Sequence, residues 1–169
     1  WFDNCAREHR AVREAVGIFD QSSFGKLFIE GADACAFLNR LATADVDVAP
    51  GRIVYTQLLN ARGGIEADLT MTRLNEDRYL LVTAAFTLTH VEAWLRDHRS
   101  PGEHVVVTDA TDAYAMLNLQ GPNARALLAA VTDADVWHAA FPYLQARTID
   151  IGYQQPLAAR VSSVRDLGR

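Results

Sequence analysis

Residues 51–85 read GRIVYTQLLNARGGIEADLTMTRLNEDRYLLVTAA and contain three strand-like segments in direct succession. The first two segments are separated by ARGG, and the last two are separated by NED. Strands joined by such short turns pair antiparallel, because parallel neighbours need a crossover connection of a dozen or more residues. This stretch therefore predicts an antiparallel meander.

The flanking sequence adds helices and further strands to this meander. Apolar residues at helical spacing predict helices over residues 7–20, 32–43, 87–98 and 123–131. In the first of these, the apolar spacing extends to Phe19, and Gly17 supplies a stop. Short apolar runs predict strands over residues 26–31, 104–109, 113–121, 147–152 and 156–164. Strands outnumber helices and their connections are short, so we expect an α+β fold with a mostly antiparallel sheet and flanking helices.

The composition indicates one compact domain over residues 1–169, because half of the residues are hydrophobic and no stretch is low in complexity. A formal charge of −5 argues against a nucleic-acid partner or an anionic membrane surface. No apolar run approaches the length of about 20 residues that a membrane span needs. Cys5 and Cys35 lack the spacing of a metal site, so we expect no metal and a reducing, cytoplasm-like compartment.

The second strand of the meander carries two carboxylates. Period-two alternation places Ile65, Ala67, Leu69 and Met71 on one face of this strand, and it places Glu66, Asp68, Thr70 and Thr72 on the other. The apolar face is predicted to be core, and the two glycines of the preceding turn, Gly63 and Gly64, supply the positive φ that the turn needs. The polar face is consistent either with the solvated side of the sheet or with a cavity in which a carboxylate holds an N–H-bearing group.

Other motifs for chemistry are missing from the sequence. There is no glycine-rich nucleotide loop, and no serine lies in a G-x-S-x-G context. His90, His98 and His104 do not have the spacing of metal ligands, so we expect surface or capping roles for them.

Several segments together resemble the tetrahydrofolate-dependent aminomethyltransferase superfamily, which comprises the glycine-cleavage T-protein and its dimethylglycine and sarcosine dehydrogenase relatives. The matching segments are residues 6–41, residues 50–85, LNLQGPNARALL at 117–128 and FPY at 141–143. Residues 1–26 look more like the folate module of the dehydrogenases, because T-proteins tend to carry His-Met where this chain has Ser23 and Phe24. The resemblance implies a folate-binding domain of the aminomethyltransferase type.

In this family the second acid of the GGI-x-x-D strand faces the reactive nitrogens of the folate, and the matching residue is Asp68. The resemblance therefore implies that Asp68 orients tetrahydrofolate and assists proton movement as nitrogen attacks a methylene carbon. That carbon is carried by lipoyl in the T-protein and by an iminium intermediate in the dehydrogenases. The implied partners are the folate, the one-carbon donor, and either a flavin dehydrogenase domain or a lipoyl carrier protein. FAD is implied only for a preceding domain outside this chain.

The resemblance also implies further folate-binding residues. Tyr55 matches a pocket tyrosine whose ring packs on the flat folate, and Phe24 matches a pocket wall. Thr70 and Thr83, on the second and third strands of the meander, complete the implied set. Ordinary core packing is the alternative for Tyr55 and Phe24.

The C-terminus departs from the family pattern. Relatives continue ARVSY-x-GE-x-G-[YFW]-E, whereas residues 159–169 read ARVSSVRDLGR. Ser163 replaces the tyrosine, Arg165 the glycine and Asp166 the first glutamate, and the glutamate that grips the pterin would come next. We therefore expect residues 1–169 to be part of a longer protein, without the end of this domain and without the family's C-terminal β-barrel domain.

Three functions remain open at the level of sequence. The first is one-carbon transfer to tetrahydrofolate within a dimethylglycine or sarcosine dehydrogenase-like protein or a T-protein homologue, in the cytoplasm or, in a eukaryote, in the mitochondrial matrix. The second is a regulatory folate-binding protein, although the Lys-Gly-Cys-Tyr-x-Gly-Gln-Glu motif of such relatives does not occur here. The third is a structural or interaction domain whose pocket no longer binds folate.

Overall fold

The computed structural model describes residues 1–161 and divides the chain into two compact units. Unit 1 comprises Trp1–Ser22 and Ala115–Arg169, and unit 2 comprises Ser23–Tyr114. The C-terminal departures at Ser163, Arg165 and Asp166 lie outside the described residues.

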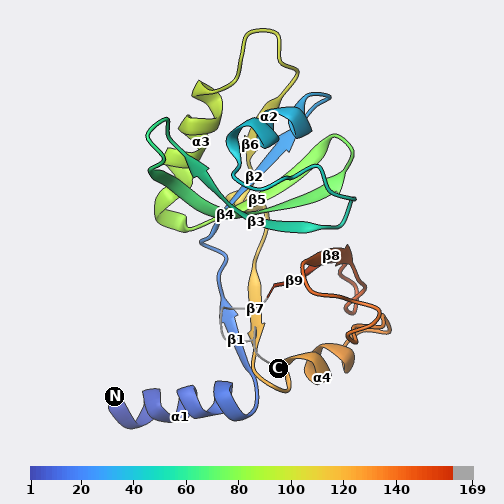
Figure 1. Ribbon diagram of the computed structural model, residues 1–169. Coiled ribbons are helices and arrows are strands. Elements are labelled where there is room, and N and C mark those ends of the chain that lie inside the picture. The colour runs from blue at the N-terminus through green and yellow to red at the C-terminus, as the bar shows by residue number, and fades with distance from the viewer. Residues whose placement is uncertain (162–169) are drawn as a thin grey trace. The chain divides into compact units, whose positions relative to one another are not determined.

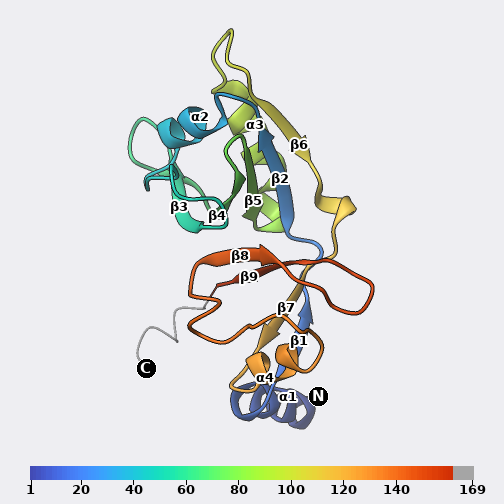
Figure 2. The same ribbon diagram turned by 90° about the vertical axis from the view of Figure 1, so that its right-hand side faces the viewer.

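Unit 2 is built on a five-stranded sheet in the order β3-β4-β5-β2-β6. Each strand pairs antiparallel with its neighbours, and Figure 2 shows the five strands side by side from β3 to β6. The strands are β2 (Gly25–Glu30), β3 (Ile53–Leu59), β4 (Ile65–Asn75), β5 (Arg78–Thr83) and β6 (Val106–Asp109). The predicted meander is confirmed as β3-β4-β5, and the α+β class with mostly antiparallel pairing is confirmed with it.

One face of this sheet is covered by two helices, α2 (Ala34–Leu41) and α3 (Leu88–Asp97), as Figure 1 shows. Two short 3-10 turns, η1 (Ala85–Thr87) and η2 (Thr111–Ala113), precede α3 and follow β6. Burying a large apolar side chain contributes about 1.5–3 kcal/mol, so this layer supplies most of the stability of unit 2. Its largest fully buried apolar side chains include Phe37, Leu38, Leu27, Ile29, Leu58, Met71, Leu81, Val91 and Leu95.

The turn between β3 and β4 is organised by Asn60. Its side-chain oxygen accepts hydrogen bonds from the backbone N–H groups of Arg62, at 3.0 Å, and Gly64, at 2.9 Å. Gly63 has φ +78°, as expected, but positive φ is not found at Gly64. A Cβ at Gly64 would lie 2.8 Å from the Asn60 side chain, so this second glycine is required for space.

In the described part of unit 1, up to residue 161, there are two antiparallel ribbons and two helices. In the first ribbon, β1 pairs with β7, which joins segments about a hundred residues apart, and in the second β8 pairs with β9. The elements are α1 (Phe2–Glu14), β1 (Gly17–Asp20), β7 (Leu117–Gln120), α4 (Ala124–Ala129), β8 (Gln145–Thr148) and β9 (Leu157–Arg160).

The prediction of a first helix reaching Phe19 is wrong. The helix ends at Glu14, and Phe19 lies in β1, where it is paired with Asn118 of β7. Gly17 is not the stop of this helix but the first residue of β1, and a Cβ at that position would lie 2.6 Å from Val12. Pairing with a distant strand therefore overrides the local helical spacing.

Candidate functional site

The register between β3 and β4 places Tyr55 and Asp68 on the same face of the sheet. Tyr55 lies opposite Thr70, and Asp68 lies opposite Gln57. Directly opposed residues share a face, and successive residues alternate, so this face is the one opposite to buried Ala67 and the core. We call it the Asp68 face, defined by Tyr55, Gln57, Asp68 and Thr70.

Tyr55 and Asp68 are joined by a short hydrogen bond. The Tyr55 hydroxyl donates to Oδ2 of Asp68 at 2.6 Å. Both residues are exposed, with Tyr55 at 56%. The hydrogen bond to Asp68 raises the pKa of Tyr55 above its ordinary value of 10.0, and a smaller desolvation effect adds to it. The phenol therefore remains a donor at physiological pH, and its ring presents a flat apolar surface beside an oriented carboxylate.

Gln57 belongs to this site, although the motif-based reasoning did not select it. The hydroxyl of Thr43 donates to its side-chain oxygen at 3.2 Å. Gln57 also lies opposite Asp68 in register. The alternation in VYTQ, which places Tyr55 and Gln57 on one face, is the sequence signal that would have found it.

A row of opposed residues extends the Asp68 face across the sheet. Thr70 of β4 lies opposite Val82 of β5, and Val82 lies opposite Lys26 of β2. The row ends at Lys26, the only lysine of the chain, whose side chain is 4% exposed.

Lys26 connects this row to Phe24. Its ammonium group donates to the backbone oxygen of Phe24 at 2.8 Å. Its backbone N–H donates to the Thr111 hydroxyl at 3.1 Å. Phe24 is half-buried in the turn before β2. The structure thus brings Tyr55, Asp68 and Thr70 together on one face and ties Phe24 to the end of the same row.

Thr83 is not brought to the Asp68 face. It lies opposite Leu69, so it shares the face that carries the core, and it is 2% exposed. Its hydroxyl is hydrogen-bonded to that of Thr87 at 2.8 Å. A Cβ at Gly25 would lie 3.0 Å from the methyl group of Thr83. Thr83 therefore supports the backbone next to Phe24 from the core side of the sheet.

Glu66 has a separate structural position. Leu59 pairs with Ile65 and Leu58 with Ala67, so Glu66 is the additional residue of a β-bulge. Its carboxylate accepts a hydrogen bond from Asn60 at 2.7 Å and contacts Nε2 of His90 at 2.9 Å. These two bonds, that of Asn60 first, lower the pKa of Glu66. Glu66 therefore joins the turn to α3, and His90 has a partner that its sequence context did not indicate.

Two other features are absent from residues 1–161. These residues contain no group of three histidine, cysteine or acidic side chains arranged to hold a metal ion. None of their helices is both long and apolar enough to cross a membrane.

Comparison with known proteins supplies the family. Residues 1–168 match the GCVT N-terminal domain family. The 4-methylaminobutanoate oxidase (formaldehyde-forming) of Paenarthrobacter nicotinovorans is 41% identical over 168 residues, which cover 99% of this chain and 20% of that protein. The aminomethyltransferase of Bacillus subtilis is 39% identical over 160 residues, with coverages of 94% and 43%.

Two further comparisons agree with this result. Human mitochondrial sarcosine dehydrogenase is 34% identical over 183 residues, which cover 98% of this chain and 20% of that protein. The crystal structure of glycine cleavage system aminomethyltransferase T from Bartonella henselae superposes with a TM-score of 0.68 at 33% identity, over 83% of this chain and 37% of that one. The chain thus spans less than half the length of each of these relatives. It belongs to the GCVT N-terminal domain family, together with aminomethyltransferases, a sarcosine dehydrogenase and a 4-methylaminobutanoate oxidase.

Proposed function

We propose that this chain binds tetrahydrofolate on the Asp68 face and takes part in one-carbon transfer to it. The observation that carries the proposal is the hydrogen bond from Tyr55 to Asp68, which sets an oriented carboxylate beside an exposed aromatic ring. Membership of a family that includes aminomethyltransferases supports it.

The residues of this face fit a reduced folate. A carboxylate accepts hydrogen bonds from N–H groups, and an exposed tyrosine ring packs on a flat heterocycle. When bound, tetrahydrofolate would supply the nitrogen that receives the one-carbon unit. Thr70 would add a hydroxyl on the same face, and Phe24, anchored by Lys26, would add a second aromatic wall.

Asp68 is the residue to which we assign the proton transfer. An amine sheds a proton as it forms a new C–N bond, so a nearby carboxylate stabilises the developing ammonium and can accept that proton. Tyr55 occupies only one carboxylate oxygen, Oδ2, and leaves Oδ1 for this role. Tyr55 thereby fixes the direction in which the free oxygen points.

The setting that we propose is a module of a larger enzyme that oxidises an N-methylated amine, such as a sarcosine or dimethylglycine dehydrogenase-like protein. Two relatives carry the names sarcosine dehydrogenase and 4-methylaminobutanoate oxidase, and this chain matches a fifth of each. In this setting the one-carbon donor is an iminium compound made by a flavin dehydrogenase region outside this chain. A lipoyl carrier protein would replace that region in a T-protein homologue. The reaction would run in the cytoplasm or, in a eukaryote, in the mitochondrial matrix.

The test is a calorimetric titration with tetrahydrofolate, followed by measurement of methylene-tetrahydrofolate formed by the full-length protein. Asp68→Asn is expected to keep the fold and to slow transfer by about a hundredfold or more, as for loss of a general base. Glu76→Gln, which changes an exposed carboxylate in the turn between β4 and β5, is the matched control and is expected to behave like the wild type. An unchanged transfer rate in Asp68→Asn would contradict the assignment. Binding without any transfer in the wild type would instead support a non-catalytic folate-binding role.

A further inference from the structure

Unit 1 contains a second concentration of functional groups. The segment 130–144 between α4 and β8 forms no regular strand or helix. Three arginines from three different elements reach it, and we call them the arginine cluster: Arg125 of α4, Arg147 of β8 and Arg160 of β9.

Each guanidinium group of the cluster is anchored to backbone oxygens of this segment. Arg125 donates to Val136, and Arg147 donates to Asp135 and to Ala140. Arg160 donates to Phe141 at 2.6 Å. These bonds hold three cations at one short stretch of chain. A guanidinium group has five N–H donors, so each arginine retains further N–H groups that can bind a ligand.

The cluster differs in its charge balance from four arginines of unit 2. Arg40, Arg73, Arg78 and Arg96 each form an ion pair with a carboxylate. Within residues 1–161, no ion pair joins a carboxylate to any member of the arginine cluster.

Two acids close to the cluster in sequence form other hydrogen bonds. The carboxylate of Asp135 accepts from the backbone of Trp137, and that of Asp150 accepts from Gln155. Three cations therefore gather without an ion pair to a carboxylate of residues 1–161, in a chain that has an excess of acids.

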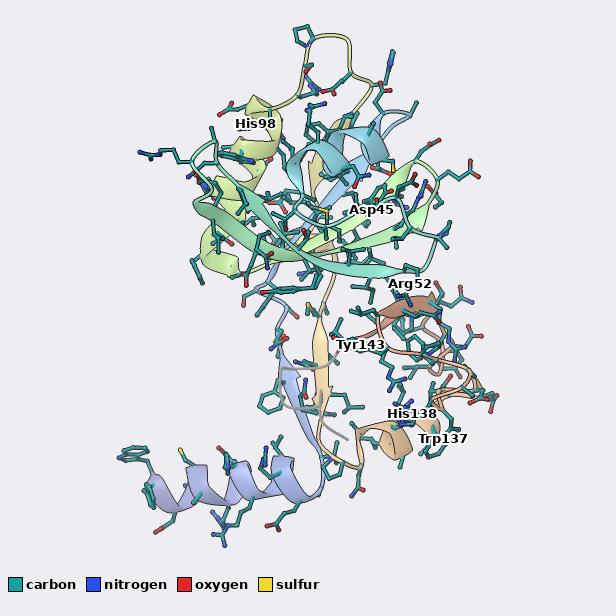
Figure 3. The ribbon with its side chains drawn as sticks, viewed as in Figure 1. Asp45, Arg52, His98, Trp137, His138 and Tyr143 are labelled. Atoms are coloured by element: carbon teal, nitrogen blue, oxygen red, sulfur yellow. The ribbon has the colours of Figure 1, made fainter. Side chains whose placement is uncertain are left out.

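His138 adds a fourth donor to the cluster. Its Nδ1 accepts a hydrogen bond from Arg160 at 2.7 Å, which leaves Nε2 to carry the proton of the neutral ring. Arg125 and then Arg160 lower the pKa of His138, and burial together with Arg160 lowers that of Arg125. The like charges are thus close enough to repel one another. His138 is exposed beside Trp137, as Figure 3 shows, so the cluster can be reached from solvent.

We propose that Arg125, Arg147, Arg160 and His138 form a binding site for a small oxyanion, with phosphate and carboxylate groups as the ligand class. Guanidinium and imidazole groups match the oxygen geometry of both, and a bound anion would neutralise the repulsion within the cluster. Anchoring to the backbone holds the guanidinium groups in place before the ligand arrives, which reduces the entropy cost of binding. This site is separate in its residues from the proposed folate site and does not depend on it.

The test is an NMR titration of the chain with inorganic phosphate, with glutarate as the carboxylate arm and chloride at matched ionic strength as the control. The His138 imidazole signal, assigned with His138→Gln, reports binding. We expect a dissociation constant of about 1 mM or below for phosphate or glutarate. We also expect the pKa of His138 to rise by about one unit at saturation, because a neighbouring anion favours the charged ring. The arm that binds more tightly identifies the ligand class.

Variants distinguish binding by the side chains of the arginine cluster and His138 from nonspecific electrostatic attraction of anions. Arg160→Gln is expected to weaken phosphate or glutarate binding about tenfold or more, and Arg96→Gln, on α3 in unit 2, is expected to leave it unchanged. Because Arg160 also anchors the chain, His138→Gln is the second variant; its side chain is exposed, so it is expected to fold and to bind measurably less well. The proposal is overturned if phosphate and glutarate act no differently from chloride. It is also overturned if neither His138→Gln nor a folded Arg160→Gln weakens binding.

Discussion

A single hydrogen bond from a neighbouring side chain determines the orientation of the Asp68 carboxylate, and with it the role that the carboxylate can take. A carboxylate alone on a strand samples several rotamers, whereas the donor from Tyr55 at 2.6 Å selects one. Tyr55 is 56% exposed, so the bond orients Asp68 without covering it. Orientation with continued access is the arrangement that a ligand-binding acid needs.

The Tyr55–Asp68 bond predicts a specific titration behaviour. Replacing Asp68 by Asn removes the negative charge, so the pKa of Tyr55 is expected to fall back towards 10.0. A raised phenol pKa favours folding below the unfolded value near 10, and this contribution is lost as pH rises through the higher folded value. Phenolate absorbance near alkaline pH, with Tyr55→Phe subtracted to isolate this ring, measures the shift. An identical Tyr55 titration in wild type and Asp68→Asn would show that the bond does not persist in solution.

A substitution at Thr83 tests whether this residue only supports the sheet or also contacts the ligand. Its hydroxyl is buried and bonded to Thr87, so Thr83→Val is expected to lower the free energy of unfolding by about 1 kcal/mol. Because Thr83 lies on the core side of the sheet, tetrahydrofolate affinity is expected to stay within about twofold of the wild type. Urea denaturation and calorimetry give the two quantities. A large loss of affinity with unchanged stability would restore Thr83 as a contact residue.

At the scale of elements, the close approach of β2 to the chain before β6 depends on Gly31. This residue has φ +134°, and a Cβ there would lie 1.9 Å from the backbone oxygen of His104. Gly31→Ala is therefore expected to lower the free energy of unfolding by more than about 2 kcal/mol. Gly102→Ala is the matched control, since Gly102 has φ +88° with no atom near its Cβ, and about 1 kcal/mol is expected for it. Equal losses in the two variants, measured by urea denaturation, would refute the collision as the cause.

Strands whose apolar and polar residues alternate could be predicted from the sequence. Elements whose structure depends on pairing with a distant segment could not. The alternation predicted for β4 is confirmed from Ala67 to Met71, and Asp68 lies on the predicted face. It is wrong at Ile65, which is 69% exposed because the bulge at Glu66 interrupts the alternation, and at Thr72, which is buried. Glu66 is not a free acid beside Asp68, because it lies in the bulge and is bonded to His90. Both features depend on how β3 and α3 pack against β4, which local alternation does not predict. The local spacing predicts a helix at Phe19, because its pairing partner in β7 lies about a hundred residues further along the chain.

The same limit applies to the candidate site. Tyr55, Asp68 and Thr70 share a face that period-two alternation can predict. The buried bond from Lys26 to Phe24 and the core-side position of Thr83 cannot be predicted this way, since both depend on how β2 and β5 lie against other elements.

At the scale of the whole molecule, apolar burial is concentrated in unit 2. All members of the main hydrophobic cluster lie there, from Leu27 to Val105. In unit 1, α1 has no buried residue, and the described buried apolar residues are Val136, Phe141, Ala146 and Ile149. A smaller buried core gives a smaller hydrophobic contribution to stability.

This difference predicts that the chain opens in stages. Backbone amides of β2, β4 and β5 are expected to exchange with deuterium most slowly, and those of β8 and β9 to exchange at least tenfold faster. Hydrogen exchange followed by mass spectrometry, together with tryptophan fluorescence during urea denaturation, checks the order. Equal protection in both units and a single coincident transition would contradict it. The interpretation of residues 1–169 as one folate-binding domain stays a prediction, because the two-unit division does not test it.

The buried position of Lys26 has a practical consequence for chemical labelling. It is the only lysine of the chain and is 4% exposed, so acylating reagents that react with primary amines cannot reach a lysine side chain while unit 2 is folded. Unfolding would release that one amine. A single added mass on the peptide that contains Lys26 would therefore count the molecules in which unit 2 has opened, without a fluorescent label or an engineered reporter.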